Sequence, residues 1–433
     1  MRLFLASSRP RAALALLGAL ALTGPSLLAQ PAADPIDTIW RQHSNDPDRC
    51  WRDPTSHARV VRVTSGFEST SLPYFHQNIF TATGDLMLFT GRREQDQGYY
   101  TLNLRTAEVR PLDQQTGQNL VVLPRRRVAA FHRGDDVFLM ELDGGRSRRL
   151  MSVPHGLLAE AAGFGFTADE KKLLFAYCDQ LAATTSRIVS ATAQKDVHVR
   201  RLDFIAAYEA MPKHNAIYSI DLDSGRLALV FQDTESHWLG HVQGSPTDPN
   251  LALFIHEGFV SVHIKNRLRL LDLRSGEVSM PRTGPLEQDS ITHEFWDRSG
   301  RSIWYDIANA SALGNLDLKT RRETRYVYGG EGRSHRSIHY AIGPGAAWAV
   351  GDGLQKDNPW LCLYRFSRRN PQSGEVPIER LCDFRPHYNN LEAHYLEPNP
   401  HLTPDAKWVL FTAHLKGNAN EIWAVEIPKD AGT

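Results

Sequence analysis

The chain has 433 residues, and its 49 Lys and Arg balance 49 Asp and Glu, so the formal net charge is zero. Aromatic residues make up 9% of it, which excludes an intrinsically disordered chain, because disorder needs few aromatics and a large net charge. The balance also gives no support to a nucleic-acid binder, which usually shows a basic excess. Eighteen histidines stand out, since imidazole is the commonest metal ligand and a common acid–base group.

The chain begins with the pattern of a secretory signal. Basic residues precede an apolar run at 12–22, and the small residue Ala29 marks the expected cleavage site. We therefore predict a signal peptide over 1–29, with a retained N-terminal anchor as the alternative. The apolar run is shorter than the roughly 20 residues of a membrane span. The mature protein is expected to be periplasmic or secreted, without a membrane span, and slightly acidic.

An N-terminal extension is expected over 30–59, and a repeated β pattern follows from residue 60. Each unit has two strands joined by a Pro, Asp or Gly turn, then a third strand and another turn. The units, spaced roughly 40 to 60 residues apart, begin near Phe75, Leu120, Phe164, His241, His293, His339 and His401. Alternation with period two indicates strands, and β repeats of this length indicate a propeller with one four-stranded blade per unit.

We therefore predict an all-β protein, a seven-bladed β-propeller over 60–433 with blades of the TolB or WD40 type. Two separate β-sandwiches are the alternative. The strand at Val60–Thr64 is expected to pair with the last blade and close the ring. A small insert at 180–212 contains a helix-like stretch, DFIAAYEAMPKH, and is expected to pack over one end of the ring.

Export permits disulfides, but four cysteines are too few for a disulfide scaffold. Cys362 and Cys382 flank a turn-rich segment and could face each other across a strand pair, so a disulfide between them stays open. Cys50 and Cys178 are expected to be ordinary small residues.

Several histidines occupy one place in the repeats, the start of the first strand of a blade. They are His76, His241, His293, His339 and His394 or His401. Because the innermost strand of each blade lines the central channel, these side chains are expected to converge at one mouth of it. Converging imidazoles are typical of a metal site or of acid–base catalysis. The alternative is that each histidine satisfies a local hydrogen bond.

Five motifs give the sequence a resemblance to a known family. They are Gly240-His241, His256-Glu257-Gly258, Thr292-His293-Glu294-Phe295-Trp296, Gly351-Asp352-Gly353 and Pro398-x-Pro400-x-Leu402-Thr403-Pro404. With them the chain resembles oligogalacturonate lyases, seven-bladed propellers that degrade short pectin fragments. The resemblance extends from Phe75 to the C-terminus.

The resemblance implies β-elimination next to a uronate carboxylate. The proton on C5 is very weakly acidic, so a positive group must neutralise the carboxylate while a base of near-neutral pKa removes the proton. In the family the histidine of Thr-His-Glu-Phe-Trp is the base, which implies His293 here. An arginine after the His-Glu-Gly motif contacts the acidic group, which implies Arg267, with Arg269 as a competitor.

The resemblance also implies a divalent metal of the manganese type. The family holds it with a histidine that opens the sixth blade, here His339, and with a Gln-x-x-His-Pro-His run that opens the seventh. In this chain His394, Glu397 and Asn399 occupy the positions of the Gln and the two His, so three of four ligands differ. The resulting set suits Mn, Mg or Ca, and even Zn. His401 could substitute for Asn399, and loss of the metal stays open.

The other candidate substrate contacts are His76, Gln77, His241, His256 and His401. The leading hypothesis is a metal-assisted lyase whose partner is a short, acidic, uronate-containing oligosaccharide. The alternative is a non-catalytic propeller of the TolB type that binds a protein or glycan. The sequence leaves open the sugar and its linkage, the identity of the metal, endo or exo action, and the oligomeric state.

Overall fold

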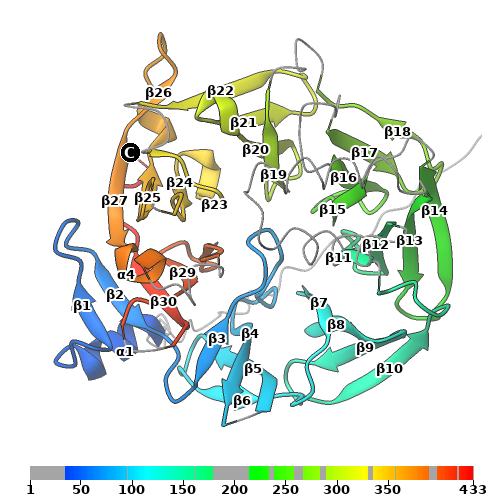
Figure 1. The fold of residues 1–433 in the computed structure, drawn as a ribbon, viewed down its shortest axis with the longest axis horizontal. Helices are drawn as coiled ribbons and strands as arrows, with labels where there is room; N and C mark the ends of the chain where they lie inside the picture. Colours follow the sequence, from blue (N-terminus) through cyan, green and yellow to red (C-terminus); the bar gives the residue numbers. More distant parts are fainter. Residues whose placement is uncertain are drawn as a thin grey trace, which may run out of the picture. The chain divides into compact units, whose positions relative to one another are not determined.

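The computed structural model describes 35–94, 96–159, 161–178, 214–233, 238–257, 267–282, 289–329, 335–355, 357–389, 397–416 and 419–432. In this part of the chain the strands form seven sheets that surround a centre as blades (Figure 1). The predicted seven-bladed propeller is confirmed. The predicted signal peptide and the insert at 180–212 lie outside the described residues.

In blades 1 to 4 the strands follow one another from the centre outward (Figure 1). Blade 1 comprises β3 (Ser69–Ser71), β4 (Leu86–Arg93), β5 (Asp96–Asn103) and β6 (Val109–Pro111). Blade 2 comprises β7 (Gln118–Leu123), β8 (Val128–Arg133), β9 (Asp136–Glu141) and β10 (Ser147–Ser152). Blade 3 comprises β11 (Ala161–Phe166), β12 (Lys172–Cys178), β13 (Asn215–Asp221) and β14 (Leu227–Asp233). Blade 4 comprises β15 (Trp238–Gly244), β16 (Leu251–Glu257), β17 (Leu268–Asp272) and β18 (Val278–Ser279).

Blades 5 to 7 follow the same plan with additions. Blade 5 comprises β19 (Ile291–Trp296), β20 (Ser302–Ile307), β21 (Ala312–Asp317) and β22 (Glu323–Tyr328), extended by β26 (Glu375–Val376). Blade 6 comprises β23 (Tyr340–Ile342), β24 (Ala349–Gly351), β25 (Trp360–Tyr364) and β27 (Ile378–Asp383). Blade 7 comprises β28 (His401–Leu402), β29 (Trp408–Ala413), β30 (Glu421–Glu426), β2 (Arg59–Arg62) and β1 (Cys50–Arg52).

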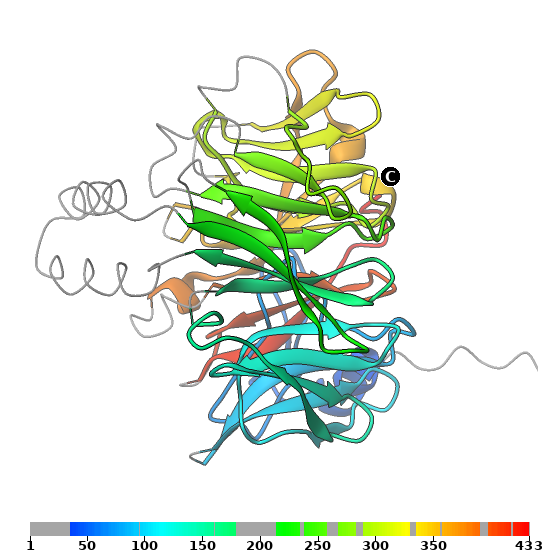
Figure 2. The ribbon, with the colours of Figure 1, turned by 90° about the vertical axis from the view of Figure 1, so that its right-hand side faces the viewer.

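The two described α-helices are α1 (Pro35–His43) and α4 (Arg385–Asn389), and α4 lies at one face of the ring (Figure 2). Short 3-10 turns occupy Ala308–Ala310, Pro344–Ala346 and Phe366–Arg368. Among the described residues, no helix has the length and apolar character that a membrane span requires.

The same turn closes the outer hairpin of several blades. In blade 3, Asp221 Oδ1 accepts the N–H of Ser224, and Gly225 has a φ of 70°. In blade 4, Asp272 and Gly276 repeat this arrangement, with a φ of 73° at the glycine. An aspartate that binds its own backbone, followed by a residue with positive φ, is a turn that the local sequence dictates. This explains why the repeat could be recognised without knowledge of the fold.

The core lies between the blades. The middle strands are covered on both faces, and every residue of β20 and of β29 is buried. Strands covered on both faces read as nearly continuous apolar runs, and WVLFTA in β29 is an example. Blades 6 and 7 share one cluster that includes Leu361, Phe411 and Trp423.

Strand β2 closes the ring. It pairs antiparallel with β30, with Val60 opposite Val425 and Val61 opposite Ala424. The predicted closing strand is thus confirmed, with bounds at Arg59–Arg62. The expected N-terminal extension adds β1 outside β2, and helix α1 buries Ile36 in the core that blades 1 and 7 share.

The expected inner strand at Phe75 is wrong. The first strand of blade 1 is β3, which ends at Ser71, and the chain over 72–79 enters the centre of the ring instead (Figure 1). Proline has no N–H to donate to a strand neighbour, so Pro73 favours an end of pairing there. His76 therefore lies in this connection and not at the start of a strand.

The cysteines are free and buried. Cys382 lies opposite Leu361, and Cys362 lies opposite Arg380, with a register shift between Leu361 and Cys362. Cys362 and Cys382 consequently belong to different core clusters, so the disulfide left open by the sequence is not formed.

Candidate active site

The innermost strands of blades 2 to 5 share a bulge. The pairing of β7, β11, β15 and β19 with the next strand shifts in register at equivalent places. At these shifts the φ values are positive, at 56° for Asn119, 72° for Gly163, 48° for His241 and 55° for His293. A positive φ strains a residue other than glycine, and bulges with such strain are common beside functional sites.

His339 is the most enclosed histidine of the site, with no exposed surface. Its Nδ1 lies 2.7 Å from Asp352 Oδ2, and Asp352 Oδ1 accepts the N–H of His339. The carboxylate therefore favours the tautomer protonated on Nδ1, which leaves the lone pair of Nε2 available. Burial lowers the pKa of His339, but the Asp352 carboxylate outweighs burial and raises the pKa above its ordinary value.

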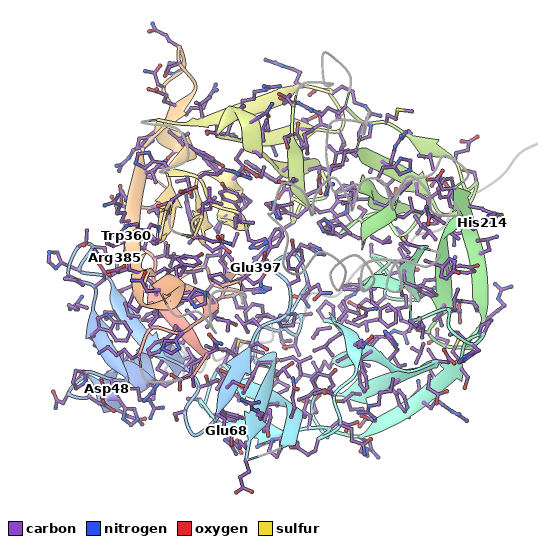
Figure 3. All side chains as sticks on the ribbon, viewed as in Figure 1. Asp48, Glu68, His214, Trp360, Arg385 and Glu397 are labelled. Carbon is purple, nitrogen blue, oxygen red and sulfur yellow. The ribbon has the colours of Figure 1, made fainter. Side chains whose placement is uncertain are left out.

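The other ring nitrogen of His339 faces Glu397. Its Nε2 lies 3.6 Å from Glu397 Oε2, and it has no hydrogen-bond partner in the described chain. Glu397 belongs to the segment that leads into blade 7 and lies near the centre of the ring (Figure 3). A buried imidazole nitrogen without a partner, beside a carboxylate, is a donor pair that a divalent cation can use.

His293 lies beside His339, with ring centroids 4.9 Å apart and planes at 86°. Its Nδ1 is 4.0 Å from Asp306 Oδ2, and no described residue forms a hydrogen bond to it. Burial, followed by His339, lowers the pKa of His293 well below its usual value. His293 is therefore a neutral imidazole near neutral pH, able to accept a proton.

A buried ion pair supports the strand that carries His293. The Asp306 carboxylate accepts two bonds from Arg336 and one of 3.0 Å from the hydroxyl of Thr292. Asp306 is fully buried in strand β20, where it is the one residue with a formal charge. The sequence analysis missed Asp306 and Arg336. A charged residue in the run SIWYDI was an available signal for Asp306, whereas nothing in the sequence marks Arg336 as its partner.

Glu294 connects the site to blade 4. Both of its oxygens accept bonds from Arg267, at 3.2 Å for the Nη2 contact, and its Oε2 lies 3.4 Å from Nδ1 of His241. Burial alone would raise the pKa of Glu294, but the Arg267 guanidinium outweighs it and holds the pKa below its usual range. Glu294 thus stays charged and fixes Arg267, whose positive charge is close enough to contribute to the lowered pKa of His293. Arg269 lies instead against Nδ1 of His256, at 3.3 Å.

The connection over 73–77, the inserted segment from here on, packs its aromatic rings against these histidines. The ring of Tyr74 lies 5.1 Å from that of His339, and the ring of Phe75 lies 4.7 Å from it. The ring of His76 lies 5.4 Å from that of His241. The sequence analysis missed Tyr74 and Phe75, because an insertion into the channel leaves no pattern in the sequence.

Asn399 and His401 hold the inserted segment in place. Asn399 Oδ1 accepts the N–H of Phe75 at 3.0 Å, and its Nδ2 donates to the carbonyl of Glu397. His401 Nε2 donates to the carbonyl of Pro73 at 3.1 Å. Burial lowers the pKa of His401 to about 4, which fits a neutral donor. The metal-binding role of Asn399 and the alternative role of His401 stay predictions.

The remaining predicted residues are Gln77, His256 and His394, and each has a different place. Gln77 lines a cavity beside the inserted segment, and its Oε1 accepts the N–H of Tyr74 at 3.2 Å. His256 lies apart, buried between Asp233 at 2.8 Å and Arg269. His394 lies outside the described residues. Within the described part of the chain, no three His, Cys, Asp or Glu side chains are grouped as a complete metal site.

Two cavities adjoin the inserted segment. One, of about 490 Å³, is bordered by blades 1 to 4 and by Tyr74, His76 and His241. We call it the neutral cavity, because none of the described residues that border it is Lys, Arg, Asp or Glu. The other, of about 750 Å³, is bordered by Phe75, Trp296 and parts of other blades.

Comparison with known proteins gives a consistent answer. A family model described as oligogalacturonate lyase matches residues 48–312. An oligogalacturonate lyase from Dickeya dadantii is 25% identical over 394 residues, covering 85% of this chain and 93% of the relative. An oligogalacturonide lyase from Pectobacterium atrosepticum is 25% identical over 395 residues, with the same coverage.

Solved structures agree in fold. An oligogalacturonate lyase in complex with manganese has a TM-score of 0.71 at 21% identity, over 89% of this chain and 97% of that chain. An oligogalacturonate lyase from Vibrio parahaemolyticus has a TM-score of 0.71 at 20% identity, over 88% and 97% of the two chains.

Proposed function

The chain belongs to the oligogalacturonate lyase family, and from this premise we propose that it cleaves short uronate-containing oligosaccharides by metal-assisted β-elimination. The observation that carries the proposal is that three functional groups lie near one another: an imidazole, a guanidinium and an imidazole–carboxylate pair. His293 contacts His339, Arg267 is fixed beside His293 by Glu294, and His339 faces Glu397. A base, a fixed cation for a carboxylate and a metal-binding pair are what this elimination requires.

His293 is proposed as the base. Its burial favours the neutral form, and its Nδ1 is not engaged by the described chain. In the reaction the C5–H bond breaks and its proton passes to the imidazole. The electron pair forms the C4=C5 double bond, the C4–O bond breaks, and the leaving oxygen takes up a proton. No water is consumed, so no nucleophile is needed.

Arg267 is proposed to neutralise the carboxylate of the reacting sugar. A guanidinium has five N–H donors, so it can bind a substrate carboxylate while Glu294 holds one of its edges. Pairing with Glu294 also removes rotational freedom from Arg267 before the substrate arrives, which reduces the cost of ordering it. The competing candidate, Arg269, contacts His256, which lies apart from His293.

His339 and Glu397 are proposed to hold the divalent metal, with His394 and Asn399 as further candidate ligands. The orphaned Nε2 of His339 fits such an ion, and Asp352 orients the ring as carboxylates commonly do for metal-bound histidines. When bound, the metal would withdraw negative charge from the substrate carboxylate. Oxygen donors favour Mn, Mg or Ca, although Zn also accepts them.

His76, Gln77 and His241 are proposed to contact the sugar, because they border the cavity beside His339. His256 and His401, which the structure ties to other groups, remain weaker candidates. We also retain the proposal of a signal peptide over 1–29 and of a periplasmic or secreted enzyme.

The decisive experiment is an ultraviolet assay for the unsaturated product on a panel of uronate oligosaccharides, with and without a chelator. Absorbance should rise with digalacturonate, fall to background with the chelator and return on addition of Mn²⁺. Absence of any rise on every uronate oligosaccharide tested would overturn the proposal. Metal content measured on the purified protein gives an independent readout.

A further inference from the structure

The bulge position of blade 3 differs from its equivalents in blades 2, 4 and 5. Asn119, His241 and His293 place side chains there, whereas blade 3 has Gly163. A Cβ added at Gly163 would meet no atom of the described chain within 4 Å. The glycine therefore leaves open space where the other blades have a side chain, and this space is part of the neutral cavity.

The neutral cavity has the size of a ligand site. Its volume is about 490 Å³, within the roughly 300 to 1,000 Å³ of typical small-molecule pockets. The side chains that border it can bind sugar hydroxyls or pack on a sugar ring. They include Tyr74, His76, Gln77, Thr90, Gln97, Tyr99, Thr116, Asn119, Phe164 and His241. Amide and hydroxyl groups both donate and accept, as sugar hydroxyls do.

Apart from the two histidines, His76 and His241, the described lining holds no side chain that carries a charge. Among the described residues that border the cavity, none is Lys, Arg, Asp or Glu. A carboxylate that enters such a place gives up part of its hydration and meets no described Lys or Arg in return, which is unfavourable. An uncharged sugar ring would not meet this penalty.

The neutral cavity adjoins the site of elimination. His241 borders it and lies 3.4 Å from Glu294, which in turn holds Arg267. Tyr74 borders it as well, and its ring lies 5.1 Å from that of His339. A sugar in the cavity would thus be a neighbour, in the same oligosaccharide, of the ring whose carboxylate faces Arg267.

We propose that the neutral cavity is a subsite for an additional sugar ring of the substrate, and that it selects a ring without charge. A methyl-esterified uronate or a neutral hexose has this chemistry. The inference rests on the proposed function and deepens it. The enzyme would act on partly esterified or mixed fragments in preference to fully acidic ones of equal length.

The test compares three trisaccharides: trigalacturonate, its form with one terminal methyl ester, and its form with one terminal acid reduced to galactose. Each modified form is tested with the change at either end. Wild-type kcat/KM should be at least about tenfold higher for a modified trimer than for the fully acidic one. Digalacturonate provides the reference that does not require the subsite.

Gly163→Asn tests the location, because asparagine tolerates a positive φ and its side chain would occupy part of the cavity. The variant should lose the preference for modified trimers and retain digalacturonate turnover within about twofold. Gly156→Asn is the matched control: Gly156 also has a positive φ, 79°, with no described atom near its Cβ, but it does not border the cavity. It should leave the preference intact.

Equal kcat/KM for all trimers, or a preference unchanged in Gly163→Asn, would overturn the subsite while digalacturonate cleavage still supports the proposed function. If no substrate is cleaved, the proposed function fails, and calorimetry with the same trimers still decides the subsite. Binding of a modified trimer that Gly163→Asn abolishes and Gly156→Asn retains would support it, and no binding would refute it.

Discussion

On the side of blades 4 to 6, buried carboxylates hold the side chains that are proposed to react: Glu294 binds Arg267, and Asp352 binds His339. On the side of blades 1 to 3, the same inner-strand bulges carry Asn119 and Gly163, and none of the described residues that line the cavity there is Lys, Arg, Asp or Glu. The backbone geometry is shared, so the difference comes from single side chains at equivalent positions. A repeat fold can therefore build two different halves on one scaffold. We call the side of blades 4 to 6 the charged half and the side of blades 1 to 3 the receptive half.

The largest effect is expected from His293, the proposed base, at the bulge of blade 5. His293→Asn keeps a residue that tolerates the positive φ but cannot accept the proton, so kcat should fall about 10²- to 10⁴-fold. His241→Asn, at the equivalent bulge of blade 4, is the comparison variant: as a proposed sugar contact His241 should affect KM, but its loss should change kcat far less. Initial rates by ultraviolet absorbance measure both, and equal losses would contradict the assignment of the base.

Glu294→Gln tests the buried ion pair of Glu294 and Arg267 on the side of blades 4 to 6. The change leaves the Arg267 guanidinium buried without its carboxylate, which typically costs about 3–5 kcal/mol of unfolding free energy. Activity should also fall, because Arg267 is no longer fixed. Urea denaturation and kcat/KM at saturating metal measure the two effects.

The control is Glu421→Gln. Glu421 is also buried and pairs with Arg62, but in blade 7. This variant should lose stability and keep its kcat/KM. Loss of activity in both variants alike would show that instability, and not the position of Arg267, governs turnover.

Asp352→Asn tests how Asp352 orients His339, which is proposed to bind the metal together with Glu397. Without the carboxylate, Nδ1 of His339 is no longer held as the donor, and metal affinity should fall about 10- to 100-fold. Calorimetric titration with Mn²⁺ measures this directly. Asp383→Asn is a control in the same blade, since Asp383 pairs with Arg385 in a solvent-accessible bridge. An unchanged affinity in Asp352→Asn would contradict the proposed orientation.

The sequence predicted the ring because its signals are local. The alternation of each strand and the aspartate turns, such as that of Asp221 and Gly225, depend on neighbours a few residues away. The inserted segment was not predictable in this way, because Asn399 and His401, more than 320 residues away in the chain, hold it in place. The same holds for the pair of Asp306 and Arg336, which only the fold brings together.

The smallest expected effect concerns Gly163 and Gly165 of β11. It tests whether the space beside Gly163 is empty, as the absence of any described atom within 4 Å of an added Cβ indicates. A Cβ at Gly165 would collide with the carbonyl oxygen of Val242, which belongs to the backbone of β15 and not to the end of a flexible side chain. Gly165→Ala should therefore lose about 1–3 kcal/mol of unfolding free energy. Gly163→Asn adds a larger side chain two residues away but into open space, so its loss should stay below about 1 kcal/mol. Parallel urea denaturation of the two variants measures the difference. A larger loss for Gly163→Asn would mean that other parts of the chain fill the space at blade 3. The side of blades 1 to 3 would then not be open, and the proposed difference between the two sides of the channel would be wrong.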